Sequence, residues 1–306
     1  MDKAVYTFDD LKNWSRETNE PPITLAVLGD PIAHSASPQM QNAALKHCGI
    51  QASYARLHIS SEQLGETLQL LREHGFLGAN LTIPHKRAAL PLLDTVDSRA
   101  KKLGAVNTLL IEDEQLIGFN TDGPGFSQVI RNEFYLDLHD LRVLVLGAAG
   151  GAGRAIATQC AIEGCERLVL VNRTEANLKP IAEELKSYFE ADRLKGPCER
   201  FITLPWDESV LKKELEHVDL IVNATPLGMK RSDPLPISQS LILPHHLILD
   251  MVYGRGRAKL LAAAEEAGAR SIGGHALLLY QGALAFEIWF NRKAPIEVMR
   301  RALLET

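Results

Sequence analysis

The chain has 306 residues, of which 46% are hydrophobic and 23% charged, and its formal net charge is −5. This balance excludes a disordered chain, which would be poor in apolar residues and strongly charged. The length fits about two domains. The acidic excess argues against a nucleic-acid partner or an anionic membrane surface, because both carry negative charge themselves.

Neither a disulfide scaffold nor a metal site is indicated. The cysteines lack CxxC spacing, which favours free thiols in a reducing cytoplasm; they are Cys48, Cys160, Cys165 and Cys198. The pair His245 and His246 has no cysteine or carboxylate at zinc spacing nearby, so we expect no metal.

A membrane segment or export signal is not expected either. The chain does not start with a basic stub followed by an apolar run. The most apolar late stretch, residues 276–290, is interrupted by Gln281 and Glu287 and is shorter than a spanning helix requires. We therefore expect a cytoplasmic protein.

Short aliphatic or β-branched runs alternate with longer helical patterns. The first half gives strands at 23–28, 52–59 and 77–82, and helices at 38–47 and 61–74. A helical pattern at 123–136 follows. The second half gives strands at 142–146, 167–171, 201–204, 220–223 and 247–250, helices at 151–163 and 175–189, and a helical C-terminal part. This alternation, without a run of hairpins, predicts an α/β fold with parallel sheets and helices on their faces.

A glycine-rich turn follows residues 143–146, an unbroken apolar run typical of a strand buried on both faces. Glycines let the backbone approach a pyrophosphate, and the N-terminus of the next helix offers N–H groups to it. Strand, turn, helix and second strand within about 30 residues predict a dinucleotide site. A tight turn that binds nothing is the alternative. The spacing departs from the usual fingerprint, because Ala149 occupies its second glycine position.

The residues after the next predicted strand bear on the choice of cofactor. They are Asn172, Arg173 and Thr174. A carboxylate here would bind the ribose 2′-hydroxyl of NAD, whereas an arginine offers a bidentate grip on the 2′-phosphate of NADP. Arg173 therefore favours NADP. NAD stays possible because Glu175 lies close by, and a solvated arginine is the alternative.

Four short polar segments lie at or after predicted strand ends in the first half, where open α/β sheets bind ligands. They are residues 29–38, 80–86, 104–108 and 118–123. Ser37, just before Pro38, is expected to be a helix N-cap with proline at the first helical position. Ser35 and Ser37 would then lie at a helix start that suits a carboxylate. Taken singly, each segment is more often turn chemistry than catalysis.

Taken together, these segments resemble the shikimate dehydrogenase family, including its quinate/shikimate branch. The matching stretches run in family order from about residue 24 to 290: P-I-A-H-S-A-S-P, N-L-T-I-P-H-K, G-A-V-N-T, N-T-D-G, the glycine turn, N-R-T, I-V-N-A-T-P-L-G-M and Y-Q-G-A-L-A-F-E-I-W. The resemblance implies two α/β domains with a cleft between them. Residues 1–122, completed by helices at 276–306, would form a substrate-binding domain with a mainly parallel sheet. Residues 123–275 would form a Rossmann-type, doubly wound NADP-binding domain.

The resemblance also implies an activity and a role for each matching residue. The reaction would be the reversible, NADPH-linked reduction of 3-dehydroshikimate to shikimate in aromatic amino-acid biosynthesis. Lys86 and Asp122 would form the catalytic acid–base pair. Other substrate contacts would come from Ser35, Ser37, Thr82, Asn107, Tyr253 and Gln281. Cofactor contacts would come from Gly147, Ala148, Ala149, Gly150, Gly151, Ala152, Asn172, Arg173, Thr174, Ala224, Thr225 and Gly274.

The departures from the family pattern do not touch Lys86 or Asp122, and one of them is Ala258, where the family commonly has a threonine. The glycine turn is one residue longer, Asn177 stands where NADP-preferring members often have a basic residue, and His275 lies in a turn that is near the nicotinamide in relatives. A quinate/shikimate dehydrogenase using NAD or NADP is the nearest alternative. A catalytically silent ligand-binding regulator is a remote one, because Lys86 and Asp122 are both present. The expected partner is a small-molecule substrate, and a monomer and a homodimer are both compatible with the sequence.

Overall fold

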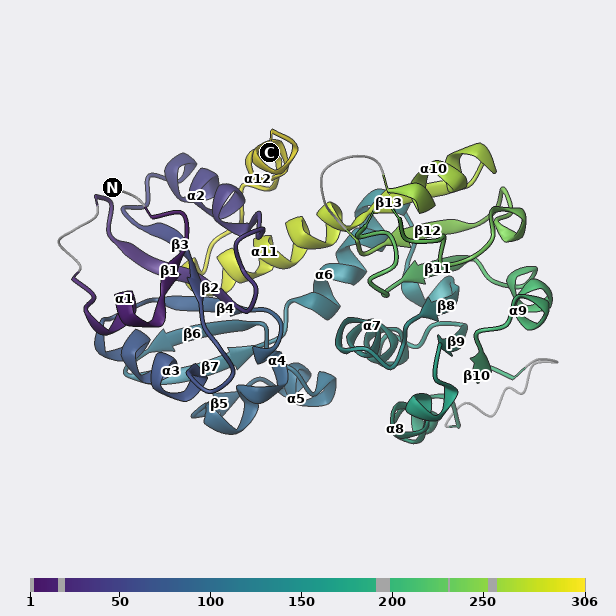
Figure 1. The fold of residues 1–306 in the computed structure, drawn as a ribbon, viewed down its shortest axis with the longest axis horizontal. Coiled ribbons are helices and arrows are strands. Elements are labelled where there is room, and N and C mark those ends of the chain that lie inside the picture. The colour runs from purple at the N-terminus through teal and green to yellow at the C-terminus, as the bar shows by residue number, and fades with distance from the viewer. Residues whose placement is uncertain (1–2, 16–19, 191–198, 231, 253–257, 306) are drawn as a thin grey trace. The chain divides into compact units, whose positions relative to one another are not determined.

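The computed structural model describes residues 3–15, 20–190, 199–230, 232–252 and 258–305 (Figure 1). The chain divides into two compact units: unit 1 is Met1–Gly125 with Leu278–Thr306, and unit 2 is Phe126–Leu277. The polypeptide passes from one unit to the other within two helices, α6 (Asp122–Val129) and α11 (Gly274–Phe290).

Unit 1 is built on a seven-stranded sheet with the order β1-β3-β2-β4-β6-β7-β5. The strands are β1 (Tyr6–Thr7), β2 (Ile23–Gly29), β3 (Ser53–His58), β4 (Gly78–Leu81), β5 (Thr95–Val96), β6 (Thr108–Glu112) and β7 (Gln115–Phe119). Strands β1 to β4 pair in parallel, whereas β6 is antiparallel to both β4 and β7. The sheet is therefore mixed.

The β6–β7 hairpin is an element that the predicted strands did not include. Its turn runs through Asp113 and Glu114, which have φ values of 48° and 62°. A two-residue turn of this kind usually contains glycine or asparagine, because those residues adopt positive φ most easily. The Asp-Glu turn lacks that signal, so the hairpin was not recognised. The short strands β1, β5 and β13 (Arg270–Gly273) were not predicted either, because none of them shows a hydrophobic period in the sequence.

Helices bury both faces of the unit 1 sheet. One apolar cluster contains residues of α1 (Phe8–Lys12), α3 (Leu64–Glu73) and α5 (Ser98–Leu103). The other contains residues of α2 (Ser37–His47), α11 and α12 (Ile296–Leu304). Along β2, Ala26 and Leu28 belong to the first cluster, while Leu25 and Val27 belong to the second. Because side chains alternate along a strand, β2 is buried on both sides, which explains its continuous apolar sequence.

Unit 2 has a six-stranded sheet with the order β10-β9-β8-β11-β12-β13, and every pair is parallel. The strands are β8 (Arg142–Leu146), β9 (Arg167–Asn172), β10 (Phe201–Pro205), β11 (Leu220–Asn223), β12 (Leu247–Asp250) and β13 (Arg270–Gly273). Strand order runs one way from β8 to β10 and the other way from β11 to β13. This is the doubly wound Rossmann-type topology, and it confirms the expected fold class.

The helices of unit 2 cover both faces of its sheet. They are α7 (Gly151–Ile162), α8 (Lys179–Glu190), α9 (Glu208–Leu215) and α10 (Lys259–Glu266). Leu144 and Leu146 of β8 pack in one cluster with α9 and α10. Val143 and Val145 therefore face the opposite side, and α7 packs against β8.

Short irregular helices complete the described chain. Residues Ile130–Phe134 continue α6 as a π-helix, and 3-10 turns lie at Leu90–Leu92, Leu138–Asp140, Glu175–Leu178 and Gln239–Leu241. The predicted helix at 175–189 is thus a 3-10 turn followed by α8. In unit 1, α4 (His85–Ala88) is a single turn after β4.

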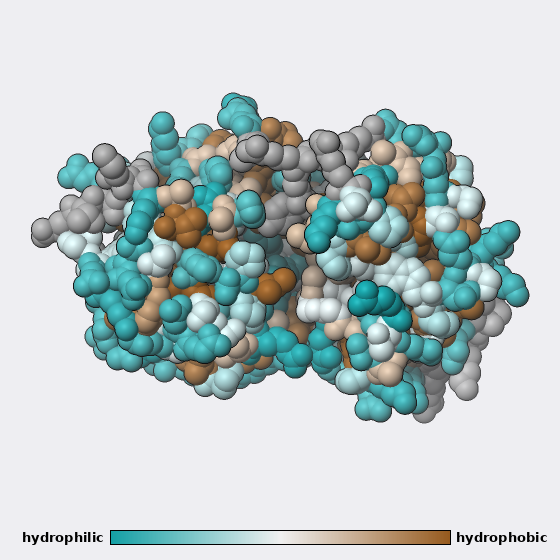
Figure 2. Space-filling model, in the orientation of Figure 1, coloured by the Kyte–Doolittle hydropathy of each residue, from teal (hydrophilic) through white to brown (hydrophobic). Residues whose placement is uncertain are grey.

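The surface shown in Figure 2 is mostly hydrophilic, with hydrophobic residues in scattered groups. The large apolar side chains exposed among the described residues include Ile83, Tyr135, Met229 and Leu304, which come from separate segments. Within the described part of the chain, no helix is both long and apolar enough to span a membrane. Cys48, Cys160 and Cys165 are free thiols, and Cys198 lies outside the described residues.

Replacing Phe286 of α11 with alanine is expected to destabilise unit 1 by about 3–5 kcal/mol. Phe286 is 0% exposed in the cluster that joins α2, α11 and α12 to the sheet. Leu304→Ala is the matched control, because Leu304 is 76% exposed, and we expect a change within about 0.5 kcal/mol. Urea unfolding followed by circular dichroism measures both. Equal losses would contradict the burial of Phe286.

Candidate active site

Four polar segments of unit 1 meet at one edge of its sheet. Strands β2 and β4 are parallel, so the loops that follow Gly29 and Leu81 leave the sheet at the same edge. Strand β6 is antiparallel to β4 and therefore begins at this edge, directly after Asn107. Strand β7 ends there, just before residues 120–122. The hairpin is thus what brings Asn107 beside Thr121 and Asp122.

Lys86 and Asp122 form an ion pair at this edge. Lys86 Nζ donates a hydrogen bond to Asp122 Oδ2 at 2.7 Å. Lys86 lies in α4 and Asp122 is the first residue of α6, so two helix starts position the pair. The Lys86 side chain is 32% exposed and that of Asp122 is 16% exposed. The ammonium group can therefore reach a ligand while its carboxylate partner stays shielded.

The side chain of Asn107 holds the carboxylate of that pair. Its Nδ2 atom donates to Asp122 Oδ1 at 3.0 Å and to Thr121 Oγ1 at 2.9 Å. Its Oδ1 atom accepts from the Thr121 amide at 2.7 Å, and Nδ2 also lies 3.3 Å from Gln281 Oε1. Asn107 is 1% exposed, so water does not compete for these bonds. One oxygen of Asp122 is held by Lys86 and the other by Asn107.

A second buried layer contacts Asn107, and the sequence interpretation missed one of its members, Tyr54. Tyr54 donates from its hydroxyl to Asn80 Oδ1 at 2.7 Å, and Asn80 Nδ2 donates to Thr108 Oγ1 at 3.0 Å. Burial raises the pKa of the Tyr54 phenol well above its usual value, although hydrogen bonding by Ser37 opposes the shift. Asn80 and Thr108 belong to the predicted polar segments 80–86 and 104–108, whereas no motif marked Tyr54 in β3.

The structure corrects the predicted N-cap at Ser37. Helix α2 begins at Ser37 itself, its N-cap is Ala36, and no side chain caps it. Ser35 Oγ, two residues earlier in the chain, accepts from the Ser37 amide at 3.3 Å. The Ser37 hydroxyl instead accepts from Ser35 Oγ at 3.2 Å. Pro38 is consequently the second helical residue, not the first.

The other predicted substrate contacts of unit 1 lie at the same edge or next to it. Gln281 of α11 donates from Nε2 to the Leu278 carbonyl at 2.9 Å and joins Asn107 through Oε1. Thr82 follows β4 and is half-buried, and its methyl group fills the space that a Cβ at Gly29 would occupy. Tyr253 lies outside the described residues.

In unit 2, the glycine turn joins β8 to α7. Gly147 has a φ of +79°, and a Cβ there would lie 2.7 Å from Thr225 Cγ2. At Gly153 a Cβ would lie 2.3 Å from the Gly147 carbonyl oxygen, so this glycine allows α7 to pack against the turn. At Gly151, the first residue of α7, a Cβ would meet no atom within 4 Å. Open space before an exposed helix N-terminus fits the pyrophosphate of a dinucleotide.

A buried amide–carboxylate pair supports the neighbouring edge of unit 2. Asn223 ends β11 and donates from Nδ2 to Asp250 Oδ1 at 2.9 Å. Its Oδ1 atom accepts from the Thr225 hydroxyl at 2.7 Å and from the Thr225 amide at 3.2 Å. Burial raises the pKa of Asp250, which is 1% exposed and also accepts from the Val252 amide. This network fixes Ala224 and Thr225 beside the glycine turn.

The remaining predicted cofactor contacts lie at the same end of the sheet. Asn172 donates from Nδ2 to the Thr174 carbonyl at 2.9 Å, which holds the segment that carries the exposed Arg173. A Cβ at Gly274 would lie 2.4 Å from the Met251 carbonyl oxygen, so only glycine fits at this start of α11. Burial lowers the pKa of the adjacent His275, which favours a neutral imidazole.

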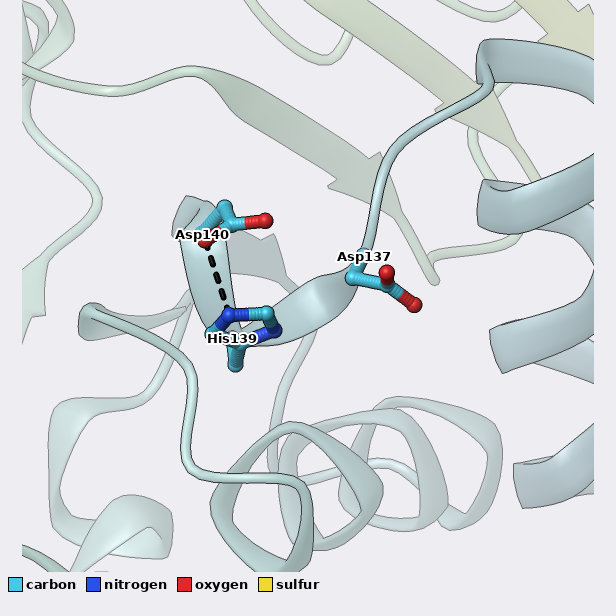
Figure 3. Close-up of side chains that lie close together, drawn as sticks. All are labelled: Asp137, His139 and Asp140. Atoms are coloured by element: carbon cyan, nitrogen blue, oxygen red, sulfur yellow. Dashed lines mark ion pairs between the residues drawn. The ribbon is translucent and has the colours of Figure 1, made fainter.

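Three polar residues with ligand-type atoms also gather at the turn Leu138–Asp140 (Figure 3). Asp140 pairs with His139 at 2.9 Å, and Asp137 pairs with Arg131 at 2.5 Å. Because each carboxylate has a cationic or imidazole partner, this cluster gives no reason to place a metal ion there. It is a set of ion pairs at the surface of unit 2.

Fold and site together define an α/β protein with a Rossmann-type unit and a lysine–aspartate pair on a separate mixed sheet. A family model described as the shikimate dehydrogenase substrate binding domain matches residues 27–109, and one described as the shikimate 5′-dehydrogenase C-terminal domain matches residues 274–304. Residues 143–231, within unit 2, match a model described as a polysaccharide biosynthesis protein.

Whole-chain comparisons agree with the first two models. A curated shikimate dehydrogenase (NADP(+)) from Methanopyrus kandleri is 40% identical over 291 residues, covering 94% of this chain and 96% of that protein. The crystal structure of shikimate 5-dehydrogenase from Thermus thermophilus in complex with NADP(H) and shikimate has a TM-score of 0.80 and 35% identity, covering 92% of this chain and 99% of that one. A quinate dehydrogenase from Corynebacterium glutamicum in complex with NAD has a TM-score of 0.81 and 26% identity, covering 93% of this chain and 99% of that one. The chain belongs to the shikimate dehydrogenase family.

Replacing Asp250 with asparagine is expected to raise the melting temperature at pH 7. The raised pKa of Asp250 means that its ionised form opposes folding. The contribution of Asp250 to the stability of the fold is most favourable below its unfolded pKa of about 3.9. That contribution is lost as pH rises through the folded pKa. Asparagine keeps the oxygen acceptor without the charge. Calorimetric scans should therefore show an advantage at pH 7 that shrinks toward pH 4.

Asp219→Asn gives the matched comparison of opposite sign. Burial of Asp219 would raise its pKa, but hydrogen bonds from Arg142 outweigh burial, so the pKa is lowered. This contribution to stability is present above the unfolded pKa and is lost as pH falls through the folded pKa. We expect Asp219→Asn to lower the melting temperature at pH 7, with the loss fading in acid. The same pH trend in both variants would contradict the assigned causes.

Proposed function

We propose that this protein is an NADP-dependent shikimate dehydrogenase that interconverts 3-dehydroshikimate and shikimate. The observation that carries the proposal is the Lys86–Asp122 pair, with Asp122 held by the buried amide of Asn107. Family membership supplies the substrate class. The proposal makes unit 1 the substrate-binding part, unit 2 the NADP-binding part, and the protein a cytoplasmic enzyme of aromatic amino-acid biosynthesis.

Lys86 is the proposed acid in the reduction. Bound NADPH supplies a hydride to the carbonyl carbon of 3-dehydroshikimate. As the carbonyl oxygen gains negative charge, the Lys86 ammonium donates a hydrogen bond to it and then transfers a proton. The amine recovers a proton from solvent, because the Lys86 side chain is 32% exposed. In the oxidation of shikimate the neutral amine accepts the hydroxyl proton.

Asp122 orients Lys86 and binds the reacting hydroxyl. The carboxylate oxygens are fixed by Lys86 and by Asn107, so the ammonium is held at one place relative to the sheet edge. Asn107, Thr82 and Gln281 are the proposed partners of the other ring hydroxyls. Fixed donors of this kind reduce the reorganisation that the reaction would otherwise require.

The substrate carboxylate is assigned to Ser35 and Ser37. Their hydroxyls lie at the start of the 11-residue helix α2, whose N-terminus carries partial positive charge. Tyr253 is proposed to complete the substrate edge. An anion at this end and a ketone at the Lys86 end match the two functional groups of 3-dehydroshikimate.

NADP is assigned to the carboxyl edge of the unit 2 sheet. The backbone at Gly150 and Gly151 would hold the pyrophosphate at the start of α7. Arg173 would grip the 2′-phosphate, supported by Asn172 and Thr174. The rest of the contact set would be Gly147, Ala148, Ala149, Ala152, Ala224, Thr225 and Gly274.

An absorbance assay at 340 nm tests the substrate and cofactor assignment. Shikimate and quinate are each offered with NADP⁺ and with NAD⁺. We expect the highest kcat/KM with shikimate and NADP⁺, by at least about tenfold over quinate, because quinate adds a hydroxyl at the carbon that bears the carboxylate. Activity with quinate and NAD⁺ alone would reverse both assignments. No activity with any pair would contradict the enzyme.

Lys86→Ala is expected to lower kcat by about 10²–10⁴-fold, the usual loss when an acid–base group is removed. Stopped-flow or steady-state rates with shikimate and NADP⁺ measure the loss, and circular dichroism checks the fold. Lys102→Ala is the control, because Lys102 is an exposed lysine of α5 in the same unit. Turnover of Lys86→Ala within a few-fold of the wild type would remove Lys86 from the mechanism.

A further inference from the structure

A cation on β3 grips the turn that carries the serine pair. Arg56 donates from Nε and Nη2 to the carbonyl oxygen of Ser35, at 2.9 Å and 2.7 Å. Nη2 also donates to Gln39 Oε1, in the first turn of α2, at 3.0 Å. A planar guanidinium that makes several bonds at once fixes its partner more firmly than a single donor does. The resemblance assigned no role to Arg56.

Arg56 shares this task with Tyr54. The two residues are two positions apart on β3, so their side chains lie on the same face, the one that α2 covers. Tyr54 lies beside the Ser37 hydroxyl and bonds Asn80, while Arg56 holds the Ser35 carbonyl. The two serines are thus each held from β3. Of Tyr54 and Arg56, only Arg56 carries a net charge at neutral pH.

The contact also decides which way the Ser35–Ala36 peptide faces. Among the described residues, the cis peptide bonds all precede proline, so this peptide is trans. In a trans peptide the carbonyl and the N–H point in opposite directions. With the Ser35 carbonyl turned toward Arg56, the Ala36 N–H points away from it, at the start of α2. The Ala36 N–H is therefore presented on the side opposite Arg56.

We propose that Arg56 is a positioning residue for the substrate carboxylate: it sets the Ser35–Ser37 turn and adds the positive charge that makes this end of the site selective for an anion. The inference rests on the proposed function. It predicts that Arg56 acts on ground-state binding of an acid and leaves the Lys86 chemistry unchanged. A neutral ester of the same molecule gains little from the charge, because it carries none.

Burial affects the guanidinium in the expected direction. It lowers the pKa of Arg56, because the charged form loses hydration, while the neighbouring Tyr54 opposes the shift. Arginine nevertheless keeps its proton at neutral pH. A half-buried cation is screened less by salt than an exposed one, so its effect on an anion should persist at physiological ionic strength.

The test compares shikimate with its methyl ester in the wild type, Arg56→Met and Arg56→Lys. For Arg56→Met we expect KM for shikimate to rise about tenfold or more, the scale for loss of a charge-assisted contact. We expect kcat, and KM for the ester, to change by less than about threefold. Arg56→Lys should be intermediate for shikimate, because it keeps the charge and loses the fork.

Arg72→Met is the matched control. Arg72 is an arginine of α3 in the same unit whose Nη2 donates to Asp94 at 3.1 Å, away from the serine turn. Its KM values for both substrates should equal those of the wild type. Melting temperature and NADP⁺ affinity show whether each variant retains its fold, and if Arg56→Met does not fold, Arg56→Lys carries the comparison.

Two results would overturn the inference. One is an equal rise of KM for acid and ester, which would mean that Arg56 supports the turn without selecting an anion. The other is a fall in kcat at unchanged KM, which would place Arg56 with the chemical step. If the wild type oxidises shikimate but the ratio of the KM values for acid and ester is the same in the Arg56 variants, this inference alone is refuted. A wild type without activity refutes the proposed function instead.

Discussion

The arrangement of the candidate site depends on one buried amide, that of Asn107. Its oxygen accepts the Thr121 amide, and its nitrogen donates to Asp122. A primary amide has both a donor and an acceptor, so it can join a backbone N–H to a carboxylate. A second carboxylate could not, because it only accepts hydrogen bonds. Because Asn107 is buried, leaving any of these bonds unmade would carry the full desolvation penalty. The position of Asp122, and through it that of Lys86, follows from this requirement.

The sequence predicted the fold best where burial alone decides which residues are apolar. Strand β8 is apolar at every position after Arg142 because both of its faces are covered, and its predicted and observed bounds coincide. The β6–β7 hairpin was missed because its turn, Asp113-Glu114, has the required positive φ angles but lacks the glycine or asparagine that usually adopts them. Tertiary pairing with β4 stabilises that turn, and such pairing is not visible in a local window.

The site residues also fall into those that a local motif marks and those that only tertiary pairing brings into place. The residues that a motif could mark, Lys86, Asp122 and Asn107, are brought together in unit 1. Tyr54 and Arg56 could not be found this way, because each lies in a strand about 20 residues from the serines it holds. Their role comes from the pairing of β3 with β2, which places them under the loop that follows β2. The N-cap at Ser37 was wrong because helix α2 begins one residue earlier than expected, at Ser37 itself, which makes Ala36 the N-cap.

The two units use the same local device at their sheet edges. In unit 1, Asn107 accepts from Thr121 and donates to Asp122; in unit 2, Asn223 accepts from Thr225 and donates to Asp250. In each case a buried asparagine holds a threonine and an aspartate: Thr121 and Asp122 both follow β7, whereas Thr225 follows β11 and Asp250 ends β12. The outcomes differ because of what lies next to the carboxylate.

That difference separates an ion-paired carboxylate from one that has no cationic partner among the described residues. Asp122 is partly exposed and pairs with Lys86. Asp250 is almost fully buried, and no ion pair reaches it within the described residues, so burial raises its pKa. A carboxylate without a cation in a buried place is most stable when neutral, and it can then serve only as a fixed hydrogen-bonding group. The same asparagine device therefore holds an ion-paired carboxylate at Asp122 and a rigid turn at Asp250, and the neighbouring lysine is what makes the difference.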